Sequence, residues 1–68
     1  MIQNDLELQT TVERIARFQK QVAHFRCVEM DPLAYHLSAG GFLAEIDRMQ
    51  REVREYFSLH PSEMNEAG

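Results

Sequence analysis

The sequence predicts an all-α protein, an antiparallel two-helix hairpin with helices at about residues 5–28 and 32–58. Apolar residues recur every three or four positions in both segments, as in amphipathic helices. An Asp-Pro pair interrupts this periodicity between the segments, and no long alternation of polar and apolar residues predicts a strand. Because a short connection between helices of similar length favours antiparallel neighbours, we expect the two helices to pack against each other.

The first predicted helix begins at Asn4 or Asp5, since either residue is a favourable N-cap. The carboxylate of Glu7 complements the positive end of the helix dipole. At about 100° per residue, the apolar side chains fall on one face and most charged side chains on the other. The residues of this helix that we expect in a core or an oligomer interface are Leu8, Val12, Ile15, Phe18, Val22 and Phe25.

Two polar residues, Gln19 and Arg26, fall inside this apolar arc. Gln19 either fixes the register of a helix pair, as buried polar residues do in coiled coils, or lies exposed at the edge of the arc. A buried guanidinium without a partner is costly. We therefore expect Arg26 to extend into solvent, to stack on Tyr35, or to pair with Glu29 or Asp31.

The second predicted helix begins at Pro32 with Asp31 as its N-cap, because proline disfavours the α conformation in the residue before it. Gly40 and Gly41 cost a helix interior up to about 1 kcal/mol each. Either the helix runs through this pair, which the unbroken apolar phase favours, or a new helix begins with Ser38 as its cap. The residues expected in the core or interface are Tyr35, Phe42, Leu43, Ile46, Met49, Val53, Tyr56 and Phe57.

The end of the chain differs in composition from the two predicted helices. Pro61 ends the periodic pattern, and the segment PSEMNEAG has little apolar content. Such a segment cannot bury enough surface to become ordered. We expect one helical hairpin over residues 1–60 and a disordered tail over residues 61–68.

Charge and composition narrow the class of protein. Seven basic and eleven acidic residues give a net charge of −4, which disfavours binding to nucleic acid. The longest apolar runs are two or three residues, far below the ~20 needed to span a bilayer. The polar start of the chain lacks the apolar region of a secretory signal, and the single Cys27 is typical of a reducing compartment. A soluble cytoplasmic protein is therefore expected.

No pattern of residues predicts a catalytic, metal or cofactor site. None of His24, His36 and His60 has a second histidine, or a glutamate three residues before it, as helical metal sites require. Cys27 follows His24 by three positions, but no third residue is placed to orient this pair as nucleophile and base. We expect no enzyme activity, no bound metal and no cofactor.

Residues 31–57, DPLAYHLSAGGFLAEIDRMQREVREYF, resemble short bacterial proteins of no assigned function. In those proteins a Pro-started helix with a G-F/Y-L-A-E-I-like core and an R-E-Y ending follows a first amphipathic helix. The resemblance implies a helical hairpin and a bacterial cytoplasmic setting. It transfers no catalytic or binding residue to this chain.

Two interpretations of function remain open. In the first, the protein is a non-enzymatic interaction or assembly module that acts as a homo-oligomer, most simply a homodimer forming a four-helix bundle. Each apolar face is wider than the seam that one partner helix covers, which favours this interpretation. In the alternative, the protein is a small regulator, either an antitoxin-like partner of another protein or a nucleic-acid-associated regulator.

Overall fold

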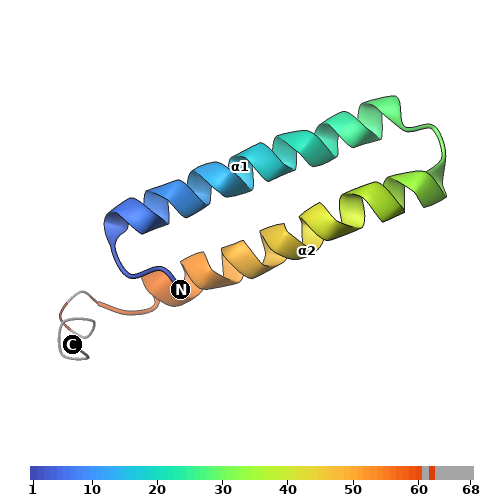
Figure 1. Cartoon of the computed structure of the whole chain (residues 1–68). Coiled ribbons are helices and arrows are strands. Elements are labelled where there is room, and N and C mark those ends of the chain that lie inside the picture. Colours follow the sequence, from blue (N-terminus) through green and yellow to red (C-terminus); the bar gives the residue numbers. More distant parts are fainter. Residues whose placement is uncertain (61, 63–68) are drawn as a thin grey trace.

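A computed structural model describes residues 1–60 and residue 62. Two helices, α1 (Asp5–Val28) and α2 (Pro32–Phe57), run antiparallel and form a hairpin (Figure 1). The predicted all-α hairpin is confirmed, and the predicted helix ends agree with the observed ones to within one residue. The tail expected over residues 61–68 lies outside the described residues, apart from Ser62.

Two hydrogen bonds between side chains and the backbone mark the start of helix α1. The side chain of Asn4 accepts a hydrogen bond from the backbone N–H of Glu7 at 2.8 Å. In return, the carboxylate of Glu7 accepts one from the backbone N–H of Gln3 at 2.7 Å. The arrangement is similar to a capping box, except that Glu7 accepts from the residue before the N-cap and not from the N-cap itself. Asn4 is therefore the N-cap, which selects one of the two residues that the sequence offered.

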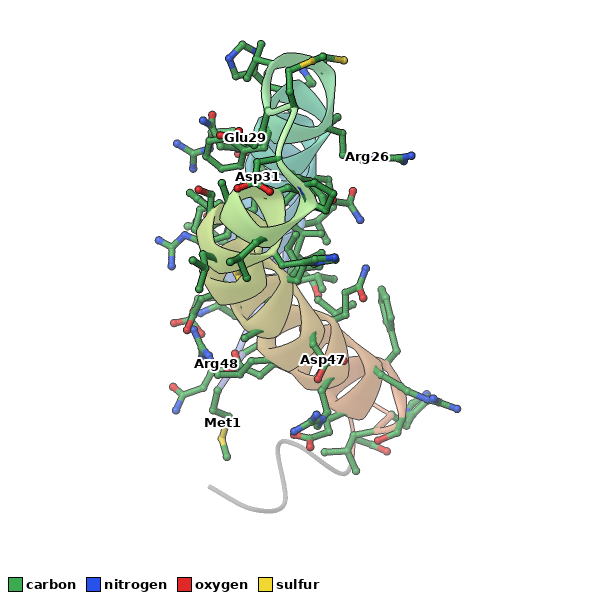
Figure 2. The ribbon with its side chains drawn as sticks, turned by 90° about the vertical axis from the view of Figure 1, so that its right-hand side faces the viewer. Met1, Arg26, Glu29, Asp31, Asp47 and Arg48 are labelled. Atoms are coloured by element: carbon green, nitrogen blue, oxygen red, sulfur yellow. The ribbon has the colours of Figure 1, made fainter. Side chains whose placement is uncertain are left out.

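The connection between the helices is held by two carboxylates. Asp31 accepts a hydrogen bond from the backbone N–H of Leu33 at 3.2 Å and caps α2, with Pro32 at its first position. Glu29 accepts a hydrogen bond from the backbone N–H of Asp31 at 3.3 Å, and both carboxylates lie at the turn (Figure 2). Neither carboxylate pairs with Arg26 within the described residues.

Helix α2 is continuous through Gly40 and Gly41. The alternative that the apolar phase favoured is thus confirmed. Ala39, immediately before the glycines, is completely buried, and Phe42, immediately after them, packs against the same core. Contacts on both sides of the pair hold it in helical conformation, as tertiary packing often overrides local propensity.

The core is one narrow seam between α1 and α2. The molecule measures 51 × 16 × 14 Å, so the described chain forms a single layer of two helices. The aromatic ring of Phe42 contacts the rings of Phe18 and Phe25, with centroid distances of 5.2 and 5.7 Å. Five buried residues form the core cluster, and four partly buried ones pack against it: Ile15, Val22, Ala39, Ile46 and Met49, then Phe18, Tyr35, Phe42 and Val53.

The open end of the hairpin is joined by two polar contacts between distant parts of the chain. The hydroxyl of Tyr56 donates a hydrogen bond to the carboxylate of Asp5 at 2.6 Å. The N-terminal ammonium group of Met1 lies 3.7 Å from a carboxylate oxygen of Glu52. Together they connect the start of α1 and the chain before it to the last turns of α2.

Ile2 is a core residue that was not predicted from the sequence. Its side chain is only 6% exposed, because the chain before α1 folds back over the hairpin. Ile2 lies near Leu6 and Thr10 of α1 and Glu52 of α2. An apolar residue shortly before an N-cap often packs on the first turns of its helix, and this signal was present in the sequence.

We expect the free energy of unfolding to decrease as the pH rises above about 10. The hydrogen bond to Asp5 raises the pKa of Tyr56 above its ordinary value of 10.0. A raised pKa means that folding favours the protonated phenol, so this stabilisation is complete below pH 10 and is lost as the pH rises through the raised pKa. Urea unfolding at a series of pH values measures the effect.

Tyr56→Phe should remove this part of the pH dependence. Tyr35→Phe is the matched control, since no hydrogen bond of the Tyr35 hydroxyl is found among the described residues. Identical alkaline pH profiles for wild type and Tyr56→Phe would contradict the role of the Asp5–Tyr56 hydrogen bond.

Candidate interaction surface

Among the described residues, no polar or charged side chain is buried. Within residues 1–60 and 62, no three His, Cys, Asp or Glu side chains lie close enough together to hold a metal ion. His24, His36 and Cys27 are exposed, and no buried polar side-chain atom in this range lacks a hydrogen-bond partner. Neither described helix combines the length and the apolarity that a membrane span needs.

The expected core and interface residues divide into three groups by exposure. Four are buried: Ile15, Val22, Ile46 and Met49. Seven are partly buried: Leu8, Phe18, Phe25, Tyr35, Phe42, Val53 and Tyr56. The remaining three are exposed: Val12, Leu43 and Phe57.

The seam between the helices has two flanks, and the chain's own residues cover only one of them. On one flank, Met49 is only 3% exposed, and Tyr56 is half buried and hydrogen-bonded to Asp5. The folded-back residues Met1 and Ile2 lie on this side, because they line a pocket with Glu52, which is three residues after Met49 and four before Tyr56. In Figure 2, Met1 lies on the side of Arg48. The flank is thus occupied by the chain's own side chains, and we call it the closed face.

The opposite flank carries the three exposed residues and is called the open face. Val12 and Leu43 are each 47% exposed and Phe57 is 68% exposed. At about 100° per residue, Val12 lies to one side of Ile15, and Leu43 and Phe57 lie on the corresponding side of the α2 seam. In an antiparallel pair these positions share one face of the hairpin. No described segment of the chain packs over this face.

Two polar residues border the apolar part of the open face. Gln19 and Arg26 follow Val12 at intervals of seven residues and so lie along the same strip of α1. Both are exposed. Arg26 makes no ion pair or hydrogen bond within the described residues and points away from the side of Met1 and Arg48 (Figure 2). Of the sequence alternatives, extension into solvent is the one observed for Arg26.

A second exposed apolar strip lies on the side of α2 that faces away from α1. Leu33 and Leu37 are followed along this strip by Gly40, Gly41 and Ala44. Beyond Ala44 the same side of α2 becomes charged and is lined by ion pairs. The carboxylate of Glu45 and that of Glu52 bind Arg48 at 2.6 and 2.8 Å, and Asp47 binds Arg51 at 2.8 Å. Unlike the open face, this strip does not adjoin the core seam.

No protein-family model, curated protein or solved structure matches this chain. The resemblance of residues 31–57 to short bacterial hairpin proteins therefore stays a prediction.

We expect Gly40→Ala and Gly41→Ala each to stabilise the protein by about 0.5–1 kcal/mol. A Cβ atom added at either position meets nothing within 4 Å, and both glycines have ordinary negative φ angles. Alanine therefore loses less backbone entropy on folding without creating a clash. Chemical denaturation of the two variants measures the gain. A loss of stability would mean that another helix approaches the backbone at the glycines.

Proposed function

We propose that this protein is a non-enzymatic assembly module that acts as a homodimer, with the open faces of two hairpins packed together in a four-helix bundle. The observation that carries this proposal is the exposure of Val12, Leu43 and Phe57 beside the core seam. Each lies next to buried residues, so a second layer placed here extends the existing core.

The energy available from this face is large for so small a domain. Full burial of an aliphatic or aromatic side chain contributes about 1.5–3 kcal/mol. Below about 70–80 residues, a single core rarely supplies more than about 3–5 kcal/mol of stability. The free energy gained by burying the exposed parts of three such side chains on each of two copies is therefore comparable with the free energy of unfolding of one hairpin. Assembly and folding are then closely coupled.

The shape of the hairpin suits a four-helix bundle. The described chain is one layer of two helices, about as thick as a single helix. A second copy supplies an identical layer. The open face of one copy then packs against the open face of the other across a twofold axis, as in most homodimers. Short connections such as residues 29–31 leave the bundle ends unobstructed. A cytoplasmic setting fits the single exposed Cys27, which has no second cysteine in the chain.

Light scattering coupled to gel filtration tests the proposal. We expect the wild type to have a mass of about 16 kDa at tens of micromolar, twice the 8.0 kDa of the chain. Leu43→Glu should abolish the dimer, because two copies would bury a carboxylate without a partner. Leu37→Glu is the matched control, since Leu37 is 75% exposed on the outer side of the same helix. This variant should remain dimeric.

Circular dichroism of the same samples separates loss of assembly from loss of folding. Leu43 is half exposed in the single hairpin, so its replacement by glutamate does not force a charge into the core of a monomer. A folded wild type of 8 kDa at tens of micromolar would overturn the proposed homodimer. Dimers of equal affinity for both variants would show that the open face is not the interface.

A further inference from the structure

We infer that the two copies pack with their loops at opposite ends, α1 against α1, around a twofold axis near Ala16. This inference rests on the proposed homodimer and specifies its geometry. A four-helix bundle of two hairpins also has a second arrangement, in which both loops lie at the same end and α1 packs against α2 of the second copy. Three features of the hairpin distinguish the arrangements.

The first feature is the separation of charge along α1. The charged residues of α1 up to Glu13 are all acidic and those from Arg14 onward are all basic: Asp5, Glu7 and Glu13, then Arg14, Arg17, Lys20 and Arg26. Two α1 helices that run antiparallel about Ala16 therefore place the acidic segment 5–13 of each copy level with residues 19–27 of the other, which include Lys20 and Arg26. Such complementarity selects the orientation of partners at an interface.

The same-end arrangement offers no such match. It places the basic half of α1 beside the first half of α2 in the second copy. That half, from Pro32 to Ala44, contains no acidic or basic side chain other than His36. The basic residues of α1 would then face an uncharged partner. Charge complementarity therefore favours loops at opposite ends.

The second feature is Arg26, the charged residue at the loop end of the open face. It has no partner among the described residues of its own copy. Asp5 precedes Ala16 by eleven residues, about three turns, and so lies on the same side of α1 as Ala16. An axis near Ala16 brings Arg26 level with residue 6 of the second copy, beside Asp5. The carboxylate of Asp5 already accepts one hydrogen bond from Tyr56, and its second oxygen can accept another from a guanidinium group.

The third feature is the packing at the axis itself. Ala16 lies on the open-face side of α1 and has a small side chain, which lets two helices approach closely. The Phe18–Phe42 contact shows which residues of α1 and α2 are level, and it places Leu43 level with Arg17. The axis near Ala16 therefore also brings Leu43 close to Leu43 of the second copy. Leu43, the exposed apolar residue at the centre of the open face, is thus buried against the Leu43 side chain of the second copy.

A distance measurement between nitroxide labels on the native Cys27 tests the geometry. Cys27 is exposed, so it accepts the label in the full-length wild-type chain. It lies eleven residues beyond Ala16, and α-helices rise 1.5 Å per residue, so the two labels should be about 33 Å apart along the bundle. With both loops at the same end, the two labels would lie at the same height on α1 helices that are diagonal across the bundle, about 14 Å apart, and would stay within roughly 20 Å of each other.

Each outcome of the double electron–electron resonance measurement has one meaning. A distance near 33 Å supports the opposite-end dimer. A distance below about 20 Å overturns this geometry and leaves the proposed homodimer standing. Absence of any dipolar coupling at tens of micromolar overturns the homodimer itself.

A matched pair of charge reversals tests the position of Arg26. Arg26→Glu should weaken dimerisation about tenfold or more, because it places a carboxylate beside Asp5 of the second copy. Arg17→Glu makes the same change in net charge on the outer side of α1 and should alter the dissociation constant much less. Equal effects of the two variants, measured by analytical ultracentrifugation, would contradict the contact between Arg26 and Asp5.

Discussion

Two packed helices can bury only one strip of side chains from each helix, and this geometry governs the rest of the molecule. The buried cluster of five residues, from Ile15 to Met49, fills that strip. The apolar arcs of both helices are wider than the strip, so apolar side chains extend onto both flanks. Each flank must be covered by something else or remain in contact with water.

The chain covers only one of its two flanks. On the closed face, the residues before α1 fold back and Ile2 becomes buried. The Asp5–Tyr56 hydrogen bond joins the two helix ends at the end of the seam. On the open face, Leu43 and Phe57 remain exposed and are accompanied by Gln19 and Arg26. Polar residues beside an apolar patch restrict which partner and which orientation are compatible with burial. The open face thus has the composition of a selective interface.

Local signals in the sequence were sufficient to predict the fold. The caps at Asn4 and Asp31, Pro32 at a helix start and the apolar period fix both helices within a residue of their observed ends. The burial of Ile2 and the Asp5–Tyr56 hydrogen bond both depend on tertiary folding. Ile2 is buried only when the chain before α1 folds back, and Asp5 meets Tyr56 only when the two helices pack together. Helical phase alone shows the side of the helix on which Val12 and Leu43 lie, but not how far their side chains are buried. Only the structure shows which flank the N-terminal residues cover.

The dependence of thermal unfolding on protein concentration tests most directly whether a second copy completes the core. Folding coupled to dimerisation makes the midpoint of unfolding rise with concentration by mass action. Circular dichroism melts over a hundredfold range of concentration should therefore shift upward by several degrees from the most dilute to the most concentrated sample. A cooperative transition whose midpoint does not change with concentration would show that one hairpin is stable alone, which contradicts the proposed assembly.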